Sequence, residues 1–200
     1  MVESAEVDKD ETPIGGLTRQ QILVEELNTA VRLAFAEKSS DVAMLLIAYA
    51  AWDILDAMAT RTGARTVRRM LEGMVASENK AKFMGYLKDP YNFLKHGKRD
   101  ANEEMPLDRS GLMEWSHFIL YAPCHDYNLL FGETTPEILT YRTIWRVHNG
   151  KAMVPPMTPE QMRAGTLLIA KSGGDPLKVI EFLEKAKDHI DTLKLDGAIY

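Results

Sequence analysis

The sequence has little cysteine and no excess of positive charge, and each shortage excludes a class of protein. A single cysteine, Cys124, occurs among 200 residues, so no internal disulfide framework can form and a reducing compartment is expected. The net charge of -5 argues against a broadly basic nucleic-acid-binding protein, although a local basic patch is compatible with it. The first residues lack the basic and apolar stretches of a signal peptide, so we expect a cytoplasmic protein.

Strand patterns, internal repeats and several familiar catalytic motifs are also missing. No segment shows the strict alternation of apolar and polar residues that indicates a strand, and no long unit recurs along the chain. The sequence contains no Walker loop, no dinucleotide-binding glycine pattern, no Gly-x-Ser-x-Gly elbow and no His-Glu-x-x-His. The remaining fold class is all-α.

The most apolar segment, VAMLLIAYAAWDILDAMA at 42–59, predicts the central helix of a bundle. Its only charged residues are Asp53 and Asp56. A helix that is apolar on all sides must be wrapped by other helices, and the two aspartates argue against a membrane span. We therefore expect an all-α, multi-helix bundle around a central apolar helix over about Ser40–Thr62.

Capping residues, glycines and prolines divide the rest of the chain into further helices. Capping boxes are predicted at Thr18–Gln21 and Thr158–Gln161, and Pro136 is expected at the first position of its helix. These helices are predicted over about 18–37, 64–76, 77–87, 91–96, 109–131, 136–149, 159–172 and from 176 onward. Pro123 should kink or split the long helix, because an internal proline removes a backbone hydrogen bond. Pro155-Pro156 is the best internal boundary. The predicted organisation is a disordered tail at 1–16, a helical bundle domain at 17–150, and a C-terminal helical hairpin packed on the bundle at 151–200.

The densest group of polar residues lies at 89–100, with the sequence DPYNFLKHGKRD. Asn92 and His96 are four residues apart and therefore lie on one face of a short predicted helix. An asparagine and a histidine beside a charged loop can hold a phosphate or a nucleotide edge, or take part in proton transfer. Alternatively, both side chains only hold the following loop through hydrogen bonds to its backbone.

Together with the small-residue-rich run AYAAWDILDA at 48–57, this group resembles the HEPN domain, a small helical bundle. The resemblance covers about Thr18–Asn149. In that family an arginine, often followed by a polar residue such as asparagine, precedes a histidine by four to six positions. His96 takes the histidine position and Asn92 the polar position, whereas Tyr91 stands in the arginine position.

Active members of the family are metal-independent ribonucleases, usually homodimers. The resemblance therefore implies a homodimer that binds RNA or a nucleotide without a cofactor, and a protein partner is a further option. No membrane is expected, because of the two aspartates in the apolar segment. The residues expected at the site are His96 and Asn92 as the catalytic pair, with Tyr91, Lys95, Lys98 and Arg99 as ligand contacts. Because a tyrosine lacks the charged fork that arginine offers a phosphate, a binding or interaction module is favoured. The alternative is a ribonuclease that uses His96 with Lys95 or Arg99 as its cation.

A second polar group lies on the long predicted helix and suggests a third hypothesis, a metal-dependent bundle enzyme. Glu114-x-x-His117 has the form of the carboxylate–histidine pair in di-iron bundles. Such a site needs a second pair, and no second Glu-x-x-His occurs in the sequence, so we expect no metal. His117 is alternatively a core residue of the bundle.

Asp53 and Asp56 need partners, because a carboxylate in so apolar a helix is costly unless it is paired or hydrogen-bonded. The candidate partners are Arg32, the cluster Arg65–Arg69, and His96. We predict that one aspartate supports the site by orienting His96 and fixing its tautomer. A buried ion pair that serves only the fold is the alternative.

Overall fold

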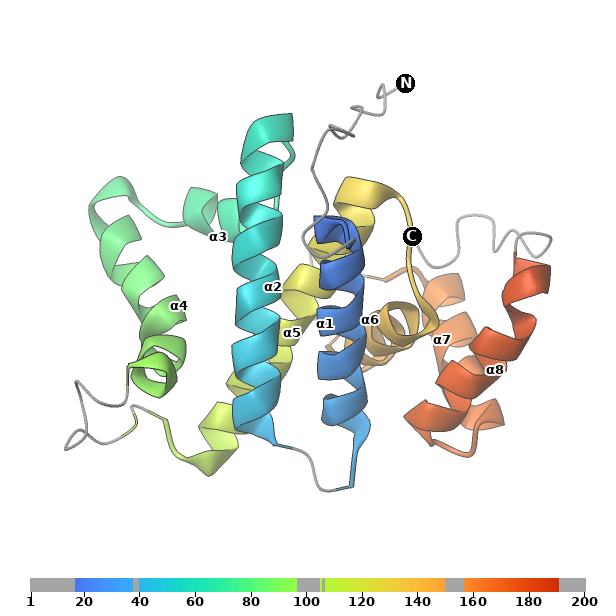
Figure 1. The fold of residues 1–200 in the computed structure, drawn as a ribbon. Helices are drawn as coiled ribbons and strands as arrows, with labels where there is room; N and C mark the ends of the chain where they lie inside the picture. The colour runs from blue at the N-terminus through green and yellow to red at the C-terminus, as the bar shows by residue number, and fades with distance from the viewer. Residues whose placement is uncertain (1–16, 38–39, 97–104, 106, 150–156, 191–200) are drawn as a thin grey trace. The chain divides into compact units, whose positions relative to one another are not determined.

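The computed structural model describes residues 17–37, 40–96, 105, 107–149 and 157–190. These residues form eight α-helices and no strand, so the all-α prediction is confirmed (Figure 1). The helices are α1 (Arg19–Phe35), α2 (Asp41–Thr62), α3 (Val67–Met74), α4 (Lys80–Lys95), α5 (Arg109–Phe131), α6 (Pro136–Asn149), α7 (Pro159–Lys171) and α8 (Pro176–Ile190). The predicted disordered tail at 1–16 lies outside the described residues.

The chain divides into two compact units, at 1–133 and 134–200, so that α1 to α5 belong to the first and α6 to α8 to the second. The sequence places the internal boundary one helix later, at Pro155-Pro156, which lies outside the described residues. The difference arises because α6 packs with α7 and α8. The packing of a C-terminal hairpin on the bundle stays a prediction.

The central helix of the first unit is α2, as the sequence predicts. Helices α1 and α5 pack along it (Figure 1). Its buried residues are Met44, Leu45, Ala48, Tyr49, Ala51, Trp52, Leu55 and Ala59. Ser40 caps the start by accepting a hydrogen bond from the Ala43 N–H, and Gly63 ends the helix at a φ of 72°. By length and composition α2 is also the one helix among the described residues that could cross a membrane, and 44% of its most apolar stretch is buried inside the protein.

The helix boundaries predicted from the sequence differ from the structure around the two internal prolines, Pro90 and Pro123. The prediction of separate helices at 77–87 and 91–96 is wrong, because α4 runs from Lys80 to Lys95 through Pro90. A short 3-10 turn at Ser77–Asn79 precedes it. Leu87 and Pro90 are buried and α4 packs against α2, and apolar burial of this kind offsets the hydrogen bond that a proline costs. The basic helix α3 is also shorter than predicted and begins after its cap, Thr66.

The long helix α5 continues through Pro123, so the alternative of two separate helices is wrong. Its packing along α2 supplies apolar burial on both sides of the proline. Asp108 caps the first turn, with its side chain accepting from the Gly111 N–H, and Gly132 ends the helix at a φ of 65°. The uninterrupted α5 packs against α1, α2 and α3.

The second unit follows its capping signals closely. Thr158 and Gln161 form the predicted capping box before α7, and Pro136 begins α6 as expected. Its apolar core joins Leu139 of α6 to two residues of α8. These α8 residues are Val179 and Leu183.

Candidate functional site

The last two turns of α4 carry the predicted polar residues. Asn92, Lys95 and His96 are exposed, while Tyr91 is half-buried. His96 is the C-cap residue, and its backbone N–H donates to the Asn92 carbonyl over 2.9 Å. We refer to Asn92, Lys95 and His96 together as the α4 end. The two other predicted ligand contacts lie outside the described residues, namely Lys98 and Arg99.

Tyr91 is fixed against the core of the first unit by aromatic stacking. Its ring lies on that of Tyr49 in α2, with the centroids 4.5 Å apart and the planes at 14°. The Lys95 Nζ lies 5.3 Å from the centroid of the Tyr91 ring. Ring pairs and cation–π contacts of this kind contribute about 1 kcal/mol each. Tyr91 therefore holds the α4 end against α2.

A cation lies near these rings, but it is buried. Arg68 of α3 is 5% exposed, and its Nη2 lies 2.8 Å from Asp53 Oδ1. Its Nη1 lies 3.3 Å from Asp56 Oδ2, and its Cζ lies 4.6 Å from the centroid of the Trp52 ring. We call Arg68, Asp53 and Asp56 the arginine cluster. Two carboxylates neutralise this guanidinium inside the protein, so it cannot serve as the charged fork of a phosphate site.

The arginine cluster shows that Arg68 is the partner of Asp53 and Asp56. Arg68 belongs to the predicted Arg65–Arg69 group, and Thr66 Oγ1 donates a further hydrogen bond of 2.9 Å to Asp56 Oδ1. The Lys88 Nζ lies 4.0 Å from Asp53 Oδ1 at the edge of the cluster. The pairing fits the alternative of an ion pair that serves the fold. The orientation of His96 by an aspartate stays a prediction.

The sequence pattern did not predict that Asp126 of α5 connects three helices. This aspartate is fully buried and accepts hydrogen bonds from the Trp52 Nε1 at 3.0 Å and the Val67 backbone N–H at 2.8 Å. Val67 begins α3, so the carboxylate binds an otherwise unbonded N–H at a helix start. Asp126 thereby joins α2, α3 and α5 and places Arg68 beside its carboxylates. The signal in the sequence that could have indicated this role is the position of Asp126 as a lone aspartate in an apolar stretch.

The residues of the metal hypothesis lie on α5. Glu114 is exposed, and burial lowers the pKa of the half-buried His117, against the attraction of Asp41. Within the part of the chain that the structure describes, no three His, Cys, Asp or Glu residues gather as a metal site requires. The additional ligands that a di-iron site needs are therefore missing from these residues.

Positive charge is concentrated around α3 and α4. The segment 61–99 contains ten Lys and Arg against three Asp and Glu, although the whole chain has 24 against 29. The exposed cations of this segment include Arg65, Lys80, Lys82 and Lys95. Apart from the buried Arg68, the acidic chain thus carries a local excess of Lys and Arg in this segment, and such an excess attracts phosphate groups over a range set by salt.

Compared with family models, curated proteins and solved structures, the chain shows no match. The resemblance to the HEPN domain therefore depends on the residues of the α4 end and on the composition of α2.

Proposed function

We propose that this chain is a HEPN-like helical binding module that recognises a phosphate of RNA or of a nucleotide at the α4 end. The observation that supports this proposal is the joint exposure of an amide, an ammonium group and an imidazole at a helix end held by Tyr91. All three groups can donate hydrogen bonds to phosphate oxygens. Their basic surroundings add long-range attraction for the same ligand.

Binding rather than cleavage is proposed because the charged fork of the nuclease motif has no counterpart at the α4 end. Tyr91 occupies the arginine position and supports Lys95 with its ring. Arg68, the nearest buried guanidinium, is neutralised by Asp53 and Asp56. A lysine offers a point charge but not the planar, bidentate geometry that stabilises a reacting phosphate. The family resemblance also leads us to propose a homodimer, and the single cysteine supports a location in a reducing compartment such as the cytoplasm.

The proposal is tested by the binding of a fluorescent single-stranded RNA, followed by anisotropy over a series of salt concentrations. We expect Lys95→Ala to weaken binding of all sequences alike and to lower the slope of log affinity against log salt by about 1. His96→Ala and Asn92→Ala should weaken it further. Lys185→Ala, an exposed lysine on α8, is the matched control and should bind like the wild type.

Two outcomes would decide against the proposal. Equal affinity of the wild type and the Lys95→Ala/His96→Ala double variant would remove the α4 end as the binding site. Cleavage of the RNA that persists in a chelator and disappears in His96→Ala would instead establish the metal-independent ribonuclease.

A further inference from the structure

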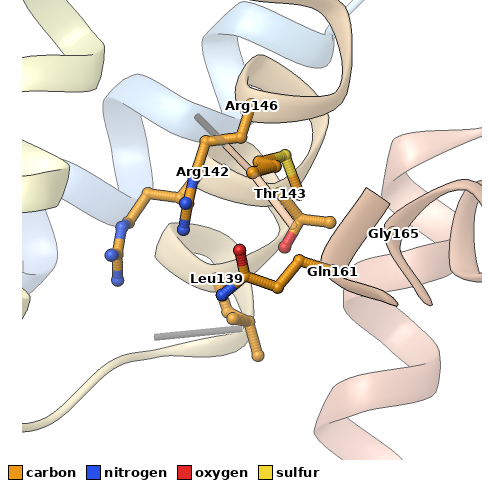
Figure 2. A pocket seen from close by; sticks show the side chains of 7 residues that line it. Leu139, Arg142, Thr143, Arg146, Gln161 and Gly165 are labelled. Carbon is orange, nitrogen blue, oxygen red and sulfur yellow. The ribbon is translucent and has the colours of Figure 1, made fainter. Parts of the chain in front are cut away.

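A small hollow lies between α6 and α7 in the second unit (Figure 2). Its walls include Arg142, Thr143 and Gln161, and the enclosed space admits about one water molecule. Arg142 and Gln161 already take part in interactions within the protein. The hollow is therefore too small for a ligand, and ligand contacts beyond the α4 end are expected on an exposed surface instead.

Tyr86 of α4 places an aromatic ring on the surface of the first unit. It is 59% exposed, and among the described residues Phe182 of α8 is the other aromatic residue that is exposed to this degree. A single exposed ring is common on protein surfaces and indicates nothing by itself. Its neighbours on the same helix decide whether it can serve a ligand.

The neighbours of Tyr86 are cationic. The Lys82 Nζ lies 5.8 Å from the centroid of the Tyr86 ring, and Lys82 precedes Tyr86 by one helical turn. Lys80 is also exposed in the first turn of α4. Proteins that bind single-stranded nucleic acids combine these two groups, because a ring stacks on a base while a lysine attracts the adjoining phosphate.

Tyr86 and the α4 end share one face of one helix, because α4 continues through Pro90. Positions 82, 86, 89 and 96 follow at intervals of four, three and seven residues, which bring side chains to the same side of a helix, and all four residues are exposed. Tyr86 and His96 are ten residues apart, which corresponds to about 15 Å along the helix axis. A single strand covers this distance with about five nucleotides, whereas a mononucleotide is too short.

Asp89 is an exposed acidic residue between these two positions. Its charge repels a phosphate near the middle of α4, over a range that salt shortens. Positive charge alone therefore does not explain binding along the whole helix. A contact between Tyr86 and an uncharged base is compatible with the aspartate, because the base carries no charge for Asp89 to repel.

On the basis of the proposed function, we propose that Tyr86 stacks on one base of a single-stranded RNA whose phosphate binds at the α4 end. Lys82 contacts the phosphate beside that base. The ligand is then an RNA strand and not a mononucleotide, and its sequence matters little, because every base offers a face for stacking.

The test compares two fluorescent probes by anisotropy on the full chain, an oligouridylate of about eight nucleotides and an abasic sugar–phosphate chain of the same length. Tyr86→Leu should weaken binding of the oligouridylate by about tenfold, the typical contribution of one stacked base, and leave the abasic chain unaffected. Tyr86→Phe keeps the ring and should bind like the wild type. Phe182→Leu, which removes an equally exposed ring on α8, is the matched control and should change neither affinity.

An effect of Tyr86→Leu on folding is excluded by the unfolding midpoint, which should not change because the side chain is exposed. Equal weakening of both probes in Tyr86→Leu would overturn the stacking contact, because the abasic chain has no base to lose. An oligouridylate affinity that Tyr86→Leu leaves unchanged would overturn it as well.

Lys95→Ala separates this contact from the phosphate site on which it depends. The variant should weaken both probes, because it removes a phosphate contact and no base contact. If Lys95→Ala weakens both probes and Tyr86→Leu weakens neither, the α4 end stands and the stacking contact fails. If Tyr86→Leu weakens only the oligouridylate and Lys95→Ala weakens neither, the phosphate site fails and the base contact stands.

The charge of Asp89 gives an independent check. Asp89→Asn should strengthen binding of both probes by the same factor, about twofold, because it removes a repulsion that does not involve a base. A poly-glutamate peptide of similar length tests an acidic protein segment as the alternative ligand. Displacement of the oligouridylate by this peptide as effectively as by unlabelled RNA would overturn the proposal.

Discussion

The arginine cluster and the α4 end lie in the same unit, but their charges differ in environment. The arginine of the cluster is buried and paired, whereas the cationic side chains of the α4 end are exposed. The guanidinium of Arg68 meets two carboxylates and the face of Trp52, and is 5% exposed. The α4 end presents Lys95 and His96 to solvent. The buried charged group is therefore the one that stabilises the fold, whereas the exposed group is the one available to a ligand. Residue type alone does not separate these roles, because the partners of each side chain decide them.

The largest expected effect comes from removing the cation of the arginine cluster. Arg68→Met should lower the free energy of unfolding by about 3 kcal/mol, because two carboxylates lose their partner. Asp53 is 42% exposed, which keeps the cost at the low end for a buried pair. Urea unfolding measures the loss. Arg65→Met, an exposed neighbour, is the control and should change stability by less than about 0.5 kcal/mol.

The next effect tests the carboxylate that positions α3. Asp126→Asn leaves one amide oxygen to accept from two donors, Trp52 Nε1 and the Val67 N–H. One buried donor then faces an NH2 group, and stability should fall by about 2 kcal/mol. Glu114→Gln on the exposed side of α5 is the matched control. Equal unfolding midpoints for the two variants would show that Asp126 does not hold α3.

A change at Tyr91 should affect both regions and so sharpen the comparison. Tyr91→Leu keeps apolar volume but removes the stack on Tyr49 and the contact with Lys95. We expect a loss of about 1 kcal/mol in stability together with weaker RNA binding. The control for stability is Tyr86→Leu, since Tyr86 lies on the same helix and is 59% exposed. RNA affinity that survives Tyr91→Leu unchanged would separate the α4 end from its aromatic support.

The smallest effect is a pH dependence that belongs to neither region. Burial lowers the pKa of His117 from its ordinary 6.5, so the unfolded chain takes up a proton at a higher pH than the folded one. The stability that neutral His117 contributes to the fold is complete above about pH 6.5. It is lost as the pH falls through the lower pKa that His117 has in the folded chain. His117→Gln should reduce the fall in stability between pH 7 and pH 5. Parallel curves for variant and wild type would contradict this.

The sequence predicted the elements whose signals are local. The apolar run of α2 and the capping boxes at Thr18 and Thr158 appear where expected, because neighbouring residues supply their own partners. The prolines at 90 and 123 misled the prediction, because packing against α2 offsets a local cost. Tertiary packing, and not the helix signal, decides such positions.

The candidate site was predictable only in part. The spacing of Asn92 and His96 placed them on one exposed turn, and Arg68 lies within the predicted partner group of the aspartates. The role of Asp126 depends on contacts with residues 59 and 74 positions away. A single sequence carries no period or spacing that reveals such long-range pairs, so this part required the structure.

The most direct test of the account is an NMR titration of the ¹⁵N-labelled chain with a short single-stranded RNA. Amide signals of Asn92, Lys95 and His96 should shift progressively, while the Trp52 indole signal, bonded to Asp126, should stay in place. That pattern would establish the exposed α4 end as the ligand site and the arginine cluster as structural. Shifts confined to Trp52 and α3, or a spectrum that RNA leaves unchanged, would contradict it.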